Sequence, residues 1–249
     1  MTEKLRLKGA LHMHTSLSHD GELSLTELAF YLKSKGYDYI ALSEHSYDIK
    51  NDSMKQLVAE AESLSSEDFI IIPGIEFRCR GWTDILGYGV VDTCDSEDPI
   101  TIIDHIHNHG GVAVLAHPNV REIPIDKSWV AMLDGCEIWN VSNEGKYLPQ
   151  SGSIRKFREL AADNTALLAF TGLDLHRTDS YCDLSTETYV ERRRPADILR
   201  ALQKGHFRSV SPLLSMDSRG TISAVSQFRI GIMRSLLNGV RGVRNLVRR

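Results

Sequence analysis

Cysteine is scarce in this chain, and the cysteines it has are not grouped. Cys79, Cys94, Cys136 and Cys182 stand far apart, and none belongs to a Cys-x-x-Cys motif. This spacing indicates neither a disulfide framework nor a zinc site built from thiolates. We expect these residues to be small, buried apolar side chains.

Long hydrophobic runs and several catalytic signatures are also absent. No window approaches the roughly 20 apolar residues of a membrane span, and no apolar stretch follows the charges of the opening MTEKLRLKGA. We therefore expect a cytoplasmic protein. The sequence has no Gly-rich phosphate loop, no Gly-x-Ser-x-Gly elbow and no Cys/His nucleophile pair. These absences argue against P-loop, serine-hydrolase and thiol chemistry.

The composition is that of an ordinary globular protein. The chain has 249 residues, of which 42% are hydrophobic and 25% charged. Single α/β barrels are common at this size. No linker or low-complexity segment interrupts the chain before residue 215, so residues 1–215 are predicted to form one barrel domain.

The first 45 residues read as a β-α-β unit. Leu5 to His14 is a predicted strand, the capping box Ser24-Leu25-Thr26-Glu27 starts a helix, and Gly36 ends it. Tyr39 to Leu42 is the next strand, directly before Ser43-Glu44-His45. Both strands end in histidine, at the edge where parallel α/β sheets bind ligands.

His12 and His14 could bind a metal ion together. They alternate with Leu11 and Met13, so a regular strand presents both imidazoles on one face. Taken alone, such a pair is either a metal chelate or a hydrogen-bonded pair of ordinary histidines.

The same strand-and-helix pattern continues along the chain. Seven or eight βα units of about 30 residues fit before residue 215. Further strands are predicted at 69–72, 84–90, 112–116, 136–141 and 166–171, and further helices at 51–65, 98–109 and 196–204.

Metal-binding side chains recur where these strands end. With Asp20 in the first βα loop, the set is His12, His14, His45, Glu76, His117, Asp174 and His176. Imidazoles and carboxylates without thiolates suit Zn, Mn or Fe(II). Eight donors exceed what one ion needs, so we expect two or three divalent ions.

The motifs that carry these residues resemble those of one family. In chain order they read LHMHT, HDG, LSEH, PGIEF, ILGYG, VLAHP and GLDLH. This set is similar to that of the PHP (polymerase and histidinol phosphatase) family over roughly residues 5–210. The resemblance implies a distorted (β/α)7-type barrel and a trinuclear metal centre. It makes all eight donors metal ligands, with Glu76 bridging two ions.

The chain departs from the family pattern at two positions. Glu44 stands where many members have Asp in Thr-Asp-His, and Asp84 stands where many have a histidine before the ILGYG-like strand. The first change leaves His45 in place. The second leaves one ion either oxygen-richer or weakly held.

Such a centre suits phosphate-ester hydrolysis. Neighbouring divalent ions lower the pKa of a shared water and neutralise phosphoryl oxygens. We expect Asp20 and His45 to take part in catalysis. Arg78, Asn140 and Arg177 are candidate substrate contacts, although Arg78 could equally be a solvated arginine at the rim. The expected substrate is a small phosphorylated compound or a nucleotide.

The C-terminal residues 228–249 differ from the rest of the chain. They hold six arginines and no acidic residue, and apolar side chains recur at helical spacing from Met233 to Val247. This pattern predicts a basic amphipathic helix, which either contacts an anionic membrane surface, docks on the barrel or binds nucleic acid. It also leaves a second hypothesis for the whole protein: a catalytically weak PHP-like binding or scaffolding module, tethered by this tail.

Overall fold

The fold is a mixed α/β structure with two six-stranded sheets. A computed structural model describes residues 4–119 and 125–228. One sheet has the order β12-β11-β10-β1-β2-β4, and the other β3-β5-β6-β7-β8-β9. The strands of the first are β1 Leu5–Met13, β2 Tyr39–Leu42, β4 Ile70–Ile72, β10 Ser185–Val190, β11 Phe207–Val210 and β12 Ser215–Asp217. Those of the second are β3 Glu44–His45, β5 Gly74–Cys79, β6 Thr83–Tyr88, β7 Val112–Leu115, β8 Gly135–Asn140 and β9 Leu168–Gly172.

The two sheets join into an irregular barrel. Only Ser43 separates β2 from β3, and only Pro73 separates β4 from β5, so two chain segments pass from one sheet into the other. On the other side, the segment after β9 pairs with the end of β1: Leu173 N–H donates to Leu11 O at 3.0 Å and His14 N–H to Leu175 O at 3.2 Å. Seven strand positions thus form a ring that is closed at the carboxyl end of β1.

The ring is not parallel throughout, so the expected series of uniform βα units is wrong in part. β6 runs antiparallel to both β5 and β7. Only residues 80–82 connect β5 to β6, which is too short for the helical crossover that parallel strands require. Strands β10, β11 and β12 extend the first sheet beyond β1, each antiparallel to the one before it, and the sequence analysis did not anticipate them.

Side chains fill the interior of the ring, and one helix closes an end. Alternate residues of the strands, such as Leu7 and Leu11 of β1 and Leu86 and Tyr88 of β6, pack in one buried cluster. Ile198 and Leu202 of α7 (Pro195–Gln203) belong to the same cluster. Because α7 packs against this end, the strand ends opposite it are left for a site.

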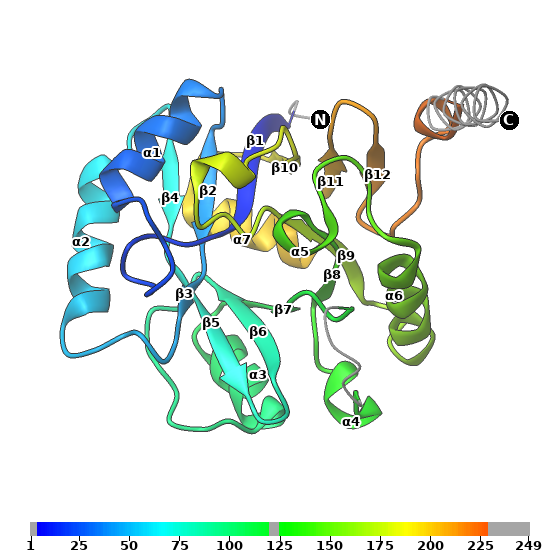
Figure 1. Cartoon of the computed structure of the whole chain (residues 1–249), viewed down its shortest axis with the longest axis horizontal. Coiled ribbons are helices and arrows are strands. Elements are labelled where there is room, and N and C mark those ends of the chain that lie inside the picture. The colour runs from blue at the N-terminus through cyan, green and yellow to red at the C-terminus, as the bar shows by residue number, and fades with distance from the viewer. Residues whose placement is uncertain (1–3, 120–124, 229–249) are drawn as a thin grey trace, which may run out of the picture.

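The remaining long helices cover the outside of the ring (Figure 1). α1 (Leu25–Ser34) and α2 (Ser53–Leu64) lie side by side along one flank, α3 (Pro99–Asn108) lies behind the β5–β6 hairpin, and α6 (Ser151–Asp163) packs on β8. Of two short helices, α4 (Lys127–Val130) contacts α3 and α6, and α5 (Val141–Glu144) directly follows β8. The predicted helices are confirmed to within a few residues, whereas α6 was not predicted.

Predicted helix starts are confirmed in their hydrogen bonds. Ser24 and Glu27 form the capping box of α1, and Gly36 has the positive φ of 75° expected at the helix end. The Asp98 side chain caps α3 by accepting from Thr101 N–H. These local signals set the positions of the helices, and so of the strand ends between them.

The predicted basic helix falls almost entirely outside the described residues. The structure describes residues up to Phe228, whose side chain is exposed. Within the described ranges, no helix combines the length and the hydropathy needed to cross a membrane.

Candidate metal centre

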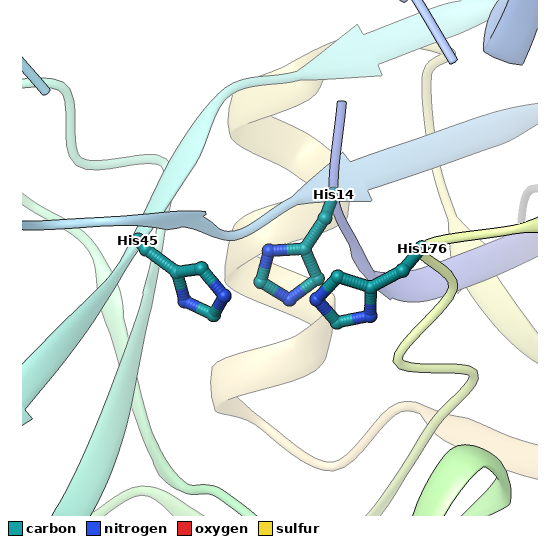
Figure 2. Close-up of side chains that lie close together, drawn as sticks. All are labelled: His14, His45 and His176. Carbon is teal, nitrogen blue, oxygen red and sulfur yellow. The ribbon is translucent and has the colours of Figure 1, made fainter. Parts of the chain in front are cut away.

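The structure brings all eight predicted donor residues together at the end of the ring opposite α7. His12 and His14 come from β1 and the residue after it, His45 from β3 and Glu76 from β5. The other four stand in the loops after β1, β7 and β9: Asp20, His117, Asp174 and His176. Figure 2 shows His14, His45 and His176 reaching toward one another from three separate segments. His12 and His14 are almost completely buried, while Asp20 lies at the edge with its side chain 45% exposed.

Three of these residues have a positive φ, which residues other than glycine rarely adopt. His12, His117 and Asp174 have φ values of 60°, 26° and 50°. Such a conformation costs about 1–3 kcal/mol per residue and concentrates at functional sites. At His12 it coincides with an irregularity in the β1–β2 pairing. Leu11 packs inside the ring and Met13 outside it, although regular alternation would place both on the same face. A bulge, rather than the predicted regular alternation, therefore turns both imidazoles to the same side.

One set of four donor atoms, which we call the first donor set, has the spacing of a metal site. It comprises Nε2 of His12, Nε2 of His14, Oε2 of Glu76 and Oδ1 of Asp174. The imidazole nitrogens lie 3.7 and 3.6 Å from Glu76 Oε2, and 3.4 and 3.5 Å from Asp174 Oδ1. Four ligands around a tetrahedral Zn²⁺ at 2.0–2.1 Å are about 3.4 Å apart. The four imidazole–carboxylate distances match this spacing, and His12, His14 and Asp174 also offer donor atoms that all lie within 4.8 Å of one another.

Glu76 also reaches beyond the first donor set. Its Oε1 lies 3.1 Å from His117 Nε2, while Oε2 lies 2.9 Å from His45 Nδ1. On the outer side, Asp20 Oδ1 lies 3.2 Å from His45 Nε2 and 3.3 Å from His176 Nε2. This arrangement supports a bridging position for Glu76 and forms a second donor set of Asp20, His45 and His176.

The buried nitrogens of this cluster lack the partners that ordinary core histidines have. Nε2 of His12, His14 and His176 and both ring nitrogens of His45 make no hydrogen bond within the described part of the chain. Buried polar atoms are nearly always satisfied, because an unpaired one costs free energy. Unpaired nitrogens that face carboxylates in this spacing fit divalent ions.

The carboxylates at the centre remain ionised. Burial by itself would raise the pKa of Glu76, but the charge of His12 and the hydrogen bond from His117 hold that pKa well below its usual range. The pKa of Asp174 is lowered in the same way by His12 and His14, against the effect of burial. Burial lowers the pKa of His14 to about 4, so this imidazole is neutral at pH 7 and one of its ring nitrogens keeps a lone pair. Against the effect of burial, the facing carboxylates raise the pKa of His12, His45 and His117, so these imidazoles hold protons that a bound cation would displace.

Glu137 of β8, which the sequence analysis did not count as a site residue, holds two of the ligands from behind. Its side chain is fully buried, and its Oε1 lies 2.8 Å from His12 Nδ1. Its Oε2 accepts from His117 N–H and from the Asn140 side-chain amide, both at 2.9 Å. A carboxylate on Nδ1 sets the tautomer that leaves Nε2 free for a metal. Gly172 makes room for it, since a Cβ there would lie 1.9 Å from Glu137 Oε1.

Glu44, one of the two departures from the family pattern, orders the loop after β1. It is buried, and it accepts from Thr15 N–H at 3.0 Å and from the Ser18 hydroxyl at 2.6 Å. The same hydroxyl accepts from His45 N–H and lies 3.3 Å from His14 Nδ1. Glu44 therefore supports the backbone around two donors without being one.

Asp84, the other departure, is paired with Arg78. Its Oδ1 accepts from Arg78 Nε at 2.5 Å, and both residues line the pocket over the donor sets. The pocket has a volume of about 210 Å³. Burial and the nearby charge of Glu76 raise the pKa of Asp84. Arg78 is thus the one of the three predicted substrate contacts that the structure brings to the pocket.

The other two predicted contacts lie elsewhere. Asn140 is fully buried behind the centre, where its side chain caps α5 and donates to Glu137. Asn143, one helical turn further on, lines the pocket and donates to Asp174 Oδ2 at 2.9 Å. Arg177 does not line the pocket and pairs with Glu22 at 2.9 Å. Asn140 stands at a strand end but does not face the pocket, because its side chain caps the helix that follows.

Comparison with known proteins gives one relative among curated sequences. No protein-family model matches the chain. A DNA polymerase/3′-5′ exonuclease PolX from Bacillus subtilis is 24% identical over 245 residues, which covers 84% of this chain and 41% of that protein. The chain thus spans about two fifths of the length of this relative.

Two solved structures are similar in fold. A two-domain protein from Bacteroides vulgatus, described as containing a predicted PHP-like metal-dependent phosphoesterase, has a TM-score of 0.64 at 17% identity and covers 86% of this chain and 67% of its own. PsfC from Pseudomonas syringae has a TM-score of 0.61 at 13% identity, covering 94% and 99% of the two chains. The predicted resemblance to the PHP family is confirmed in the fold.

The geometry predicts the metal content of single-residue variants. Asp174→Ala and His12→Ala each remove an atom of the first donor set, so we expect each to lower both the bound metal and the activity. Elemental analysis of chelator-free protein measures the metal. His107→Ala is the control, since His107 lies on α3 and bonds Asp134, which is not one of the donor residues. Wild-type protein that is folded but holds less than one ion per chain would contradict the assignment.

Glu137→Gln should weaken metal binding although Glu137 is not a predicted ligand. An amide has one acceptor oxygen, so it cannot satisfy His12, His117 and Asn140 together. Loss of such a supporting carboxylate typically costs 10- to 100-fold in metal affinity. Competition with a chelator measures this. Glu144→Gln is the matched control. Glu144 accepts from the backbone N–H groups of Asn140 and Gln150, and neither of these is a donor residue. Equal affinities for Glu137→Gln and wild type would show that Glu137 only fills space.

Proposed function

We propose that the protein hydrolyses a phosphate ester with the help of two or three divalent ions, Zn, Mn or Fe. The observation that carries this proposal is the first donor set, with its unpaired nitrogens beneath a pocket that contains Arg78. The descriptions of the similar proteins agree with it at the level of metal-dependent phosphoester chemistry. Ions at the donor sets would activate a water molecule and neutralise phosphoryl oxygens.

The residues around the pocket divide the remaining tasks. Asp20 is the most exposed carboxylate of the donor sets, so it is placed to exchange a proton with the substrate or with solvent. His45 Nε2 lies 3.2 Å from Asp20 Oδ1, so the two residues would help to hold the same ion. Arg78 is fixed by Asp84 through Nε and donates from Nη2 to the Tyr47 hydroxyl at 3.5 Å, which leaves its other terminal N–H groups to bind phosphoryl oxygens. Asn143 holds Asp174 from the opposite side.

The expected substrate is a small phosphorylated compound or a nucleotide. The pocket volume of about 210 Å³ suits a phosphoryl group with a small part of its alcohol. The name of the PolX relative adds a nucleic-acid end to the substrates to be tested. A panel of phosphomonoesters, diesters and short oligonucleotides, assayed with Mn²⁺, Zn²⁺ and Fe²⁺, tests the proposal.

The alternative of a binding or scaffolding module predicts a different result from the same panel. Such a module would bind a phosphorylated ligand but would not turn over any member of the panel with any of the three ions. The retention of all eight donor residues favours the enzyme, because a module without chemistry has no need to keep them.

Arg78→Ala should reduce turnover while the metal stays bound. The variant loses a charge-assisted contact to the phosphoryl group, so we expect kcat/KM to fall about 10- to 100-fold. Metal content measured on the same sample should match that of wild type, since Arg78 has no lone-pair donor for a metal ion. Asp84→Asn is the matched control, because it keeps an oxygen that can accept from Arg78 Nε. An unchanged kcat/KM for Arg78→Ala would make Arg78 a solvated residue of the rim.

The basic C-terminal segment is proposed to attach the protein reversibly to anionic membranes. Each basic residue near such a surface contributes about 1 kcal/mol, and the attraction falls as salt rises. Full-length protein should therefore co-sediment with anionic vesicles at low salt, and a chain ending at Gln227 should not. Both should hydrolyse a soluble phosphoester equally. If the shortened chain precipitates or loses activity, the segment packs on the barrel instead.

A further inference from the structure

Two exposed aromatic side chains stand at the mouth of the pocket. Tyr47, in the loop after β3, is 44% exposed, and Trp82, in the turn between β5 and β6, is 61% exposed. Both line the same pocket as the donor residues. A single exposed ring needs no explanation, but two such rings at one pocket beside the donor residues are placed to contact a ligand.

Both rings are held in place by charged or aromatic neighbours. The Tyr47 ring stacks on His45, with centroids 5.0 Å apart and planes 13° from parallel. The guanidinium carbon of Arg78 lies 4.9 Å from the centre of the Tyr47 ring and 5.5 Å from that of Trp82. Arg78 is itself fixed by Asp84. The Tyr47–Arg78–Trp82 group, which we call the aromatic rim, therefore needs little ordering when a ligand binds.

The backbone that presents Trp82 is unusual as well. Trp82 has a φ of 65°, directly after Gly81 at 76°. A bulky residue with positive φ is rare, and such strain concentrates at sites that hold ligands. Glycine at this position would adopt the same conformation at lower cost.

The pocket itself is too small to hold much more than the reacting group. Its volume of about 210 Å³ is below the roughly 300–1,000 Å³ of pockets that enclose drug-sized ligands. The phosphoryl group has to lie over the donor sets. The rest of a larger substrate must then extend past Arg78 and over the aromatic rim.

We propose that the substrate is a phosphate ester whose alcohol carries a planar ring, either a nucleobase or an aryl group, and that this ring stacks on the aromatic rim. The inference rests on the proposed phosphoesterase function and narrows its substrate class. Stacking on an aromatic side chain contributes enough to decide between substrates, since alanine substitution typically weakens binding about 5- to 100-fold per base. A sugar phosphate without a planar, aromatic ring gains no stacking energy from the aromatic rim.

Trp82 supplies a direct binding signal that does not depend on turnover. The chain has three tryptophans, and the other two, Trp129 and Trp139, are buried. A ring that stacks on Trp82 should change its fluorescence. We therefore expect adenosine 5′-monophosphate or phenyl phosphate to quench the metal-loaded protein saturably, and ribose 5-phosphate to cause little change. Stronger binding of the first assigns a nucleobase, and of the second an aryl group.

Substitution at the rim gives the second test. Trp82→Ala should raise KM for the ring-bearing ester about 10-fold while KM for ribose 5-phosphate stays within about twofold, and Trp82→Phe should recover most of the loss. Tyr147→Ala is the matched control, since Tyr147 is 74% exposed but does not line this pocket. Equal effects of Trp82→Ala on both esters, or quenching by ribose 5-phosphate as strong as by the nucleotide, would overturn the proposal. Ring-selective quenching without hydrolysis of any ester would instead retain the rim and refute the phosphoesterase.

Discussion

The buried carboxylate of Glu76 is the constraint on which the site depends. Its two oxygens face four imidazoles that come from β1, β3 and the loop after β7. An isolated charge in this position would be very costly, so it has to be matched by positive charge. The unusual backbone at His12, His117 and Asp174 is what allows the ends of different strands to meet around it. The fold thus spends stability at this end of the ring in order to concentrate charge.

The support for this arrangement comes from a layer that binds no substrate. Glu137 fixes His12 and the backbone of His117, while Glu44 fixes the loop that leads from His14 to Asp20. Gly172 leaves the space that Glu137 needs. These residues fix the positions of the donor side chains before an ion binds, so the ion does not have to order them.

Much of this could be predicted from the sequence because it is encoded locally. Capping residues and strand ends gave the places of α1 and α3 and of all eight donors, and repetition of the pattern indicated one shared site. The direction of β6 and the role of Glu137 depend instead on contacts between segments distant in the chain. Asn140 illustrates the limit: its place at a strand end was predicted, but its hydrogen bonds to Glu137 and α5 turn it away from the pocket. The imidazoles of His12 and His14 lie on the same side as predicted, but a bulge at His12 is the cause, and hydrophobic periodicity cannot predict a bulge.

The measurement that tests the central claim most directly is anomalous diffraction from crystals of the protein grown with Zn²⁺ or Mn²⁺. The account predicts a strong peak within about 2.0–2.2 Å of all four atoms of the first donor set, His12 Nε2, His14 Nε2, Glu76 Oε2 and Asp174 Oδ1. A second peak is expected beside Asp20, His45 and His176. Absence of a peak between His12 and His14, with the four side chains hydrogen-bonded to one another or to water instead, would contradict the metal centre and the function built on it.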